Sequence, residues 1–253
     1  MRKSTKNKLT KAIHGVLIIF TVILALLASL YAAIRDVSVQ SIIARSAAGF
    51  VSKSFNTDVK INTFYVTPDL ELHFSDLQIN DLEQYPMLKI DEFKTSIAFD
   101  FPFDKIRLKE VFLKNAMFKL VTYEGNEMSN LAEMLSQLPE NQSVKNSDNE
   151  LNLIVDKILV DNAHFVLWNQ NKDNPERKSM DYKHMDFDSI FLEIHNFEYR
   201  SDTITGFIRD IKADERCGID LKSFTANVLF CPTDVNVANA LIDINNSHLD
   251  LNL

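Results

Sequence analysis

The stretch VFLKNAMFKL occupies residues 111–120, and a second stretch, ILVDNAHFVL at residues 158–167, repeats its arrangement of apolar and polar residues. The match continues toward the N-terminus of both stretches, and seven apolar residues of the first copy have an apolar counterpart 47 positions later. The matched pairs are Ile106/Leu153, Leu108/Val155, Val111/Ile158, Leu113/Val160, Ala116/Ala163, Phe118/Phe165 and Leu120/Leu167. The residues between them change freely among Lys, Asp, Asn and Met. The repeat therefore predicts a structural unit with one apolar face.

Both copies begin with an apolar–x–apolar–x–x–apolar–x–apolar unit that occurs six times in the chain. Side chains alternate between the two faces of a strand, so the three-residue gap would turn the apolar set to the wrong face. A β-bulge absorbs the extra residue and bends the strand, whereas Lys109-Glu110 and Asp156-Lys157 are poor turn dipeptides. The units are Val59/Ile61/Phe64/Val66, Leu72/Phe74/Leu77/Ile79, Ile106/Leu108/Val111/Leu113, Leu153/Val155/Ile158/Val160, Met185/Phe187/Ile190/Leu192 and Ile219/Leu221/Phe224/Ala226. We predict a mainly β protein with a long, curved, repeat-like sheet.

The N-terminus differs from this pattern. Residues 1–11 are basic and contain no acid, and residues 12–34, AIHGVLIIFTVILALLASLYAAI, are uncharged over a length that can cross a bilayer, about 20 residues. This predicts a cytoplasmic stub followed by a transmembrane signal anchor, with the rest of the chain outside the cytoplasm by the positive-inside rule. A cleaved signal peptide and a buried core helix are the alternatives.

Two helices are expected outside the predicted membrane anchor. Residues 37–56 place apolar side chains on one helical face, which indicates a helix that caps the open end of the sheet or, alternatively, binds a membrane surface. The stretch MSNLAEMLSQL at 128–138 predicts a short helix with Ser129 or Asn130 as its N-cap. A polar linker follows at about 138–150, inside a β domain spanning 57–253. A weaker third copy of the repeat, INNSHLDL, occupies 244–251.

Composition excludes several classes of function. The net charge of −8 argues against a nucleic-acid partner, and five glycines without a phosphate-binding pattern argue against a nucleotide cofactor. No nucleophile motif is present, so we predict neither an enzyme nor a cofactor.

Two sets of polar residues are candidate sites. Asp181, His184, Asp186 and Asp188 could share a metal, but Met185 and Phe187 are predicted to form the buried face of that strand, leaving the polar residues facing water. Cys217 and Cys231 allow either one disulfide bridge or two separate buried thiols.

Several stretches resemble one known family. They are VQSIIARSAAGFVSKSFNTDVKINTFYV at 39–66, LHFSDLQIND at 72–81, IRLKEVFLKNAMFKLV at 106–121 and YKHMDFDSIFLEIHNFEYRSDTITGFIRDIKADERCGIDLKSFTANVLF at 182–230. Together with the basic stub and the anchor, they resemble the AsmA/TamB family, in particular the TamB-like proteins of Bacteroidota. The chain has Cys217 where the family pattern prefers Ser, and Ile219 where it prefers Phe.

The resemblance implies an inner-membrane protein, anchored through residues 12–34, whose periplasmic sheet forms an apolar groove (AsmA/TamB-like). Such proteins carry phospholipid toward the outer membrane, or help to assemble outer-membrane proteins with a barrel partner. Family members of the TamB type are several times longer, so we expect this chain to be an N-terminal part that lacks the partner-docking end.

On this basis the apolar residues of the two repeats are expected to line a passive conduit for phospholipid acyl chains. The predicted lining residues are Ile106, Leu108, Val111, Leu113, Phe118, Leu120, Leu153, Val155, Ile158, Val160, Phe165 and Leu167. Three alternatives remain: a closed sandwich with a dry core, a scaffold for outer-membrane strands, and an enzyme or sugar-binding domain. The last would need a polar pocket, and the sequence pattern predicts none.

Overall fold

The computed structural model describes residues 36–55, 57–98, 106–137, 152–172, 179–200 and 202–251. The predicted stub at 1–11, the span at 12–34 and the linker at 138–150 lie outside these residues. Among the described helices, none combines the length and apolarity needed to cross a membrane.

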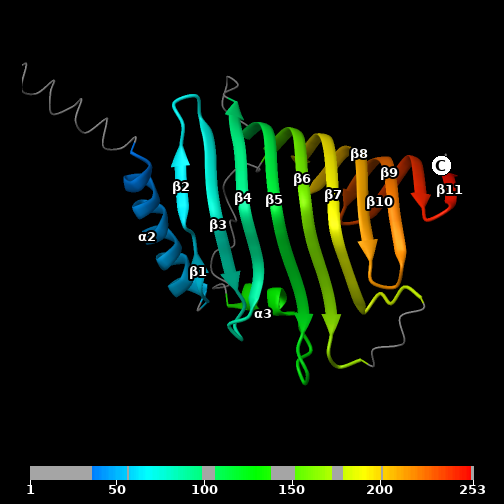
Figure 1. Ribbon diagram of the computed structural model, residues 1–253, viewed down its shortest axis with the longest axis horizontal. Coiled ribbons are helices and arrows are strands. Elements are labelled where there is room, and N and C mark those ends of the chain that lie inside the picture. Colours follow the sequence, from blue (N-terminus) through cyan, green and yellow to red (C-terminus); the bar gives the residue numbers. More distant parts are fainter. Residues whose placement is uncertain are drawn as a thin grey trace, which may run out of the picture.

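The described strands form a single curved sheet (Figure 1). Its eleven strands have the spatial order β1-β3-β4-β5-β6-β7-β8-β9-β10-β11, and β2 also pairs with β3. The elements are α2 (Val37–Phe55), β1 (Val59–Lys60), β2 (Thr63–Val66), β3 (Glu71–Asn80), β4 (Pro86–Ala98), β5 (Ile106–Thr122), α3 (Asn130–Ser136), β6 (Asn152–Asn169), β7 (His184–Arg200), β8 (Thr203–Glu215), β9 (Ile219–Cys231), β10 (Asp234–Ile244) and β11 (Ser247–Leu251). The mainly β prediction and the long curved sheet are confirmed.

The two copies of the repeat are neighbours in this sheet. β5 and β6 pair in parallel, and each residue of the first copy lies opposite its counterpart, from Ile106 beside Leu153 to Leu120 beside Leu167. The other described pairs of strands are antiparallel. The constant offset of 47 residues between the two copies is therefore also the register in which β5 and β6 pair.

The predicted bulges occur at three of the six units. In β5, β7 and β9 the register of strand pairing shifts by one residue at the three-residue spacing of the unit. In β3 the extra residue, Asp76, adopts a left-handed conformation with φ of 51°, and the pairing with β4 keeps its register. The unit in β6 also keeps its register across Val155–Ile158. The prediction is wrong for Val59–Val66, because the chain divides there into β1 and β2 instead of forming one bent strand.

A row of left-handed residues crosses the sheet and helps to bend it. Asn115 in β5 and Asn162 in β6 have φ of 49° and 57°, and they occupy the same position of the repeated Asn-Ala dipeptide. Asn tolerates this conformation better than most residues with a side chain. The Asn162 amide donates to Asn115 Oδ1 at 2.7 Å, and the Asn115 amide donates to Asp91 Oδ2 at 2.9 Å. These bonds tie the bend of one strand to the bend of the next.

The third copy of the repeat is not a bent strand. β10 ends at Ile244, the chain turns at Asn245, and β11 begins at Ser247, so 244–251 contains the turn of the β10–β11 hairpin and its second strand. Asn245 has φ of 50°, which suits a two-residue turn between antiparallel strands.

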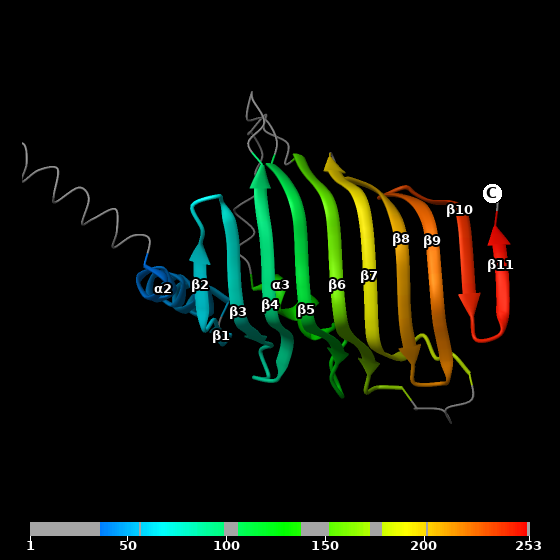
Figure 2. The same cartoon turned by 45° about the horizontal axis from the view of Figure 1, so that its top comes forward.

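Helix α2 covers one edge of the sheet, as predicted, and Figures 1 and 2 both place it beside β1 and β2. An uncovered edge strand exposes unpaired N–H and C=O groups that attract other strands. Four side chains of α2 bond to these groups: Gln40 to Val66, Ser41 to Phe64, Arg45 to Asn62 and Ser52 to Val59. The helix therefore replaces a neighbouring strand.

The expected alternative of a closed sandwich is not what the described strands form. They make one sheet whose contacts run between neighbouring strands. Its buried hydrophobic residues in the described part are few and mostly small: Met87, Ile90, Val155, Ala213, Ala226 and Ala240. Most apolar side chains are therefore only half-buried, on a face that no second described sheet covers.

Candidate functional site

The predicted lining residues lie side by side on β5 and β6. Parallel pairing sets each one opposite its counterpart, and partners of neighbouring strands share a face of the sheet. The rings of Phe118 and Phe165 are 6.2 Å apart and tilted by 39°. Val155 is buried, Ile106 is 50% exposed and the other ten are half-buried. The repeat therefore produces one continuous apolar surface that is partly open to solvent.

This surface, the apolar face, extends across more strands than the repeat predicts. Antiparallel pairing continues its rows from β4 through β8. One row runs Phe93, Leu113, Val160, Leu192 and Ile211, and the next runs Val111, Ile158, Ile194 and Ile208. The contribution of β4 was missed, although Ile90 and Phe93 are separated by the same three-residue spacing as the repeat units.

Large apolar side chains become more exposed toward β11. Phe230 is 50% exposed, its cross-strand partner Val235 is 63% exposed, and Leu249 and Leu251 on β11 are 48% and 41% exposed. β10 covers one edge of β11, and all five residues of β11 are exposed. The apolar face thus reaches the end of the described sheet opposite α2 (Figure 2).

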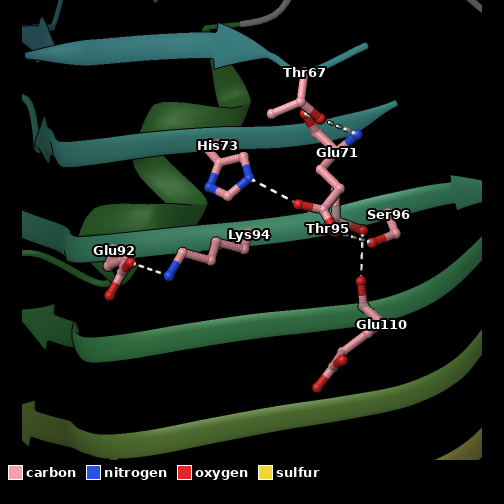
Figure 3. A network of polar contacts seen from close by, with 8 residues as sticks. All are labelled: Thr67, Glu71, His73, Glu92, Lys94, Thr95, Ser96 and Glu110. Carbon is pink, nitrogen blue, oxygen red and sulfur yellow. Dashed lines mark hydrogen bonds and ion pairs between the residues drawn. The ribbon is translucent and has the colours of Figure 1, made fainter. Parts of the chain in front are cut away.

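The opposite face carries charged and polar side chains, as the varying positions of the repeat suggest. Figure 3 shows one polar network on β3, β4 and β5. His73 Nε2 lies 3.3 Å from Glu71 Oε2, and the Ser96 hydroxyl donates to Glu71 Oε1 at 3.4 Å. Lys94 pairs with Glu92, which raises the pKa of the lysine and lowers that of the carboxyl.

A hollow of about 190 Å³ adjoins this network. The Lys94 ammonium also lies 5.8 Å from the centre of the Phe112 ring. Glu71 and Glu92 remain 44% and 37% exposed, so the contacts resemble those of a solvated sheet surface and supply no activated nucleophile.

The four residues of the candidate metal site do not lie together. His184 is buried, contrary to the prediction that it faces water, because the ring of Trp168 packs edge-on against it at 4.8 Å. Its Nδ1 lies 2.5 Å from Asp181 Oδ2, and its Nε2 lies 2.8 Å from the carbonyl of Asn169. Asp186 instead pairs with His164 at 2.7 Å. Within the described residues, no group of three or more His, Cys, Asp or Glu could hold a metal ion.

The two cysteines are separate thiols. Cys217 lies in the turn before β9 and Cys231 is the last residue of β9, so the length of the strand separates them. Of the two arrangements left open by the sequence, the separate thiols are present, but both cysteines are half-buried and not buried as expected. A hydrogen bond with Thr233 lowers the pKa of the Cys231 thiol, and burial raises that of Cys217.

A second hollow, of about 460 Å³, was not predicted. It is lined by Asp81, Tyr85, Pro86, Lys119, Val121, Tyr123, Asn130, Val166, Trp168 and Gln170. We call it the aromatic hollow. Lys119 and Val121 alternate along β5 with Phe118 and Leu120, so the strand part of the hollow lies on the face opposite the apolar face.

A buried polar cluster fixes one wall of the aromatic hollow. The Asp81 carboxylate accepts from the Tyr85 N–H at 2.9 Å, the Tyr123 hydroxyl at 2.5 Å and the Asn130 amide at 3.1 Å. Burial and the bond to Asp81 raise the pKa of Tyr123 well above its ordinary value. Asn130 was predicted as a possible N-cap of α3, but Ser129 holds that position and Asn130 turns inward.

Comparisons with known proteins add no assignment, since no protein-family model and no curated protein matches the chain. The class that the fold defines is a single curved β-sheet with one largely apolar face and one face of mixed polar and apolar side chains.

Proposed function

We propose that the protein holds phospholipid acyl chains against its apolar face and guides them along it, as a passive conduit from the inner toward the outer membrane. In this proposal residues 12–34 anchor the chain in the inner membrane, the sheet is periplasmic, and the protein belongs with the AsmA/TamB-like proteins. The observation that carries the proposal is the apolar face itself, which runs over neighbouring strands without a covering layer in the described part.

The energetics of acyl chains suit such a surface. Burying a methylene group contributes about 0.8 kcal/mol, so a chain that lies across several strands is held by many small contributions. The row of Phe118, Phe165 and Phe187 meets Glu215 on β8, but the two rows described above consist of Val, Ile, Leu and Phe and carry no charged side chain. A lipid can therefore move along them without a deep local minimum, while its headgroup stays in water.

The division of the faces also supports a lipid path. The opposite face carries ion pairs such as Arg107–Asp156 and Lys157–Glu110, which remain hydrated. Helix α2 covers the sheet edge next to the proposed anchor by bonding to the backbone of β2. Another strand therefore cannot pair with this edge, and a lipid that leaves the inner membrane can reach the apolar face there. No chemical step is needed, and we propose no catalytic role.

Photocrosslinking in cells tests this proposal. A photoreactive amino acid replaces Phe165, on the apolar face, or Asp161, whose partner Lys114 marks the opposite face, in the full-length protein. We expect lipid adducts, identified by mass, at residue 165 and not at residue 161. Crosslinks from 165 only to the same chain would mean that protein covers the face, and the conduit proposal would fail.

One observation favours a second function, a scaffold for outer-membrane strands that works with a barrel partner. β11 pairs with β10 on one side, and all five of its residues are exposed. Such an edge can add an extended strand through backbone hydrogen bonds. A crosslinker at Leu251 distinguishes the two functions, because adducts with outer-membrane proteins there, without lipid adducts at 165, would favour the scaffold.

A further inference from the structure

The aromatic hollow has a different character from the apolar face. Its rings are Tyr85, Tyr123 and Trp168, which come from the β3–β4 turn, the end of β5 and the end of β6. Tyr85 and Tyr123 lie 6.0 Å apart and are tilted by 38°, and Tyr85 is 61% exposed. Parallel pairing sets Trp168 beside Val121 on the floor of the hollow. These rings offer flat apolar surfaces at an opening that a ligand can enter.

The positions of the rings are fixed by groups that do not need a ligand. The Tyr123 hydroxyl is held by Asp81, and the guanidinium of Arg216 lies 4.5 Å over the ring of Trp168. Asn130, which is 2% exposed, bonds to the backbone of β5 at Lys119 and Val121. The hollow is therefore built in advance, as ligand pockets usually are.

Polar groups that face the hollow point to the charge of the ligand. Lys119 lines it, and no carboxylate of the described residues lies within ion-pair distance of the Lys119 ammonium. The side-chain oxygen of Gln170, Oε1, accepts from the Glu124 backbone N–H at 3.1 Å. The side-chain NH₂ group of Gln170 is then left to donate to a ligand. The Asp81 carboxylate already accepts three hydrogen bonds and is directed toward the wall. An anionic group would therefore be held at Lys119.

We infer that the aromatic hollow binds a sugar that carries a carboxylate or a phosphate group. The C–H faces of a pyranose ring pack on tyrosine and tryptophan rings, its hydroxyls accept from the Gln170 amide, and its anionic group pairs with Lys119. A volume of about 460 Å³ is within the range of small-molecule sites. A proline-rich peptide also suits aromatic grooves, but it would leave the ammonium of Lys119 without a partner. This inference does not depend on the lipid proposal, since the floor of the hollow is on the opposite face.

The chain provides its own reporter, because Trp168 is its only tryptophan. The full chain in detergent micelles is titrated with glucuronate, glucose 6-phosphate, neutral glucose and inorganic phosphate while tryptophan fluorescence is recorded. We expect a saturable change with at least one of the two anionic sugars, and binding at least tenfold weaker for glucose and for phosphate alone.

Variants separate recognition from folding. Lys119→Gln should weaken binding of the anionic sugar at least tenfold and remove its preference over glucose, whereas Lys119→Arg should retain most of both. Lys114→Gln, which alters a lysine on the same face of β5 outside the hollow, should leave binding unchanged. Circular dichroism checks that each variant folds.

Three results would overturn the inference. They are the absence of a fluorescence change with either anionic sugar, equal binding of glucose, and unchanged binding by a folded Lys119→Gln variant. Saturation by a proline-rich peptide instead of a sugar would assign the hollow to peptide recognition.

Discussion

Replacing Asn130 by alanine should destabilise the protein more than any ordinary surface substitution. The Asn130 side chain takes the place of a strand beside β5, since its Oδ1 accepts from Val121 N at 3.1 Å and its amide donates to the Lys119 carbonyl at 3.1 Å. The same amide donates to Asp81. Asn130→Ala removes all three bonds, which join α3 to two other parts of the sheet.

The magnitude follows from these bonds. A hydrogen bond between neutral groups contributes about 1 kcal/mol, and one to a charged group contributes about 2 kcal/mol. The sum is about 4 kcal/mol, and water that enters from the adjoining aromatic hollow should recover some of it. We expect a loss of about 3 kcal/mol in the free energy of unfolding, a large share of the 5–15 kcal/mol typical of a domain.

Urea unfolding followed by Trp168 fluorescence measures this loss. With a slope of about 2 kcal/mol per M, the midpoint should fall by about 1.5 M. Asn236→Ala is the matched control, because Asn236 is exposed on β10 and its side chain has no hydrogen-bond partner in the described part of the chain. A surface change of this kind should alter stability by less than about 0.5 kcal/mol. An Asn130→Ala loss as small as that of the control would refute the role assigned to Asn130.

Three further predictions concern the bend, the acid response and the capped edge. Both Asn162→Val and Asn162→Gly remove the bond to Asn115, but Asn162→Val should cost about 2 kcal/mol more than Asn162→Gly in urea unfolding, because a β-branched residue resists the left-handed backbone. The hydrogen bond with His184 lowers the pKa of Asp181, so its stabilising contribution is present above the unfolded pKa of about 3.9 and is lost as pH falls through the lower folded pKa. Acid unfolding below pH 4 should therefore be steeper for the native chain than for Asp181→Asn. Combined Gln40→Ala and Ser41→Ala changes free backbone groups of β2 and should cause concentration-dependent association in sedimentation velocity.

Each of these has an outcome that contradicts it. Equal effects of Val and Gly at residue 162 would show that the left-handed backbone imposes no constraint. Parallel acid-unfolding curves would remove Asp181 from the acid response. For the edge, Ser46→Ala is the control, because its hydroxyl bonds within α2 to the Ile42 carbonyl. Association of this control to the same extent would mean that helix instability, not an exposed strand, causes it.

The register of β5 and β6 was accessible from the sequence because it depends on local spacing. A repeat that matches residue for residue at a constant offset pairs in parallel without adjustment, and Ile106 meets Leu153 as that offset requires. The repeated Asn-Ala dipeptide also indicated where the strands bend, which the apolar spacing alone does not show. Asn is among the few residues that adopt a left-handed conformation readily, so Asn115 and Asn162 could have been assigned to the bend.

The aromatic hollow was not accessible in the same way, because its parts come from separate segments. Asp81 follows β3, Asn130 begins α3, and Trp168 lies near the end of β6. No periodic pattern relates these residues. They meet only because β5 and β6 are adjacent and parallel, which brings Tyr123 and Trp168 to the same end of the sheet. The buried state of His184 was mispredicted for a related reason, since the residues that cover it belong to a different strand and turn.

The single-layer sheet connects stability to the proposed function. A sheet with few fully buried hydrophobic residues relies on cross-strand contacts, on backbone hydrogen bonds and on the cap formed by α2. Part of the surface of its apolar face therefore stays in contact with water after folding, and a ligand can gain free energy by burying it. A ligand that covers this face stabilises the folded state by about 2.7 kcal/mol when its concentration is 100 times its dissociation constant. Acyl chains that occupy the face would complete the hydrophobic layer that the described strands leave open, so lipid binding and folding stability would rise together.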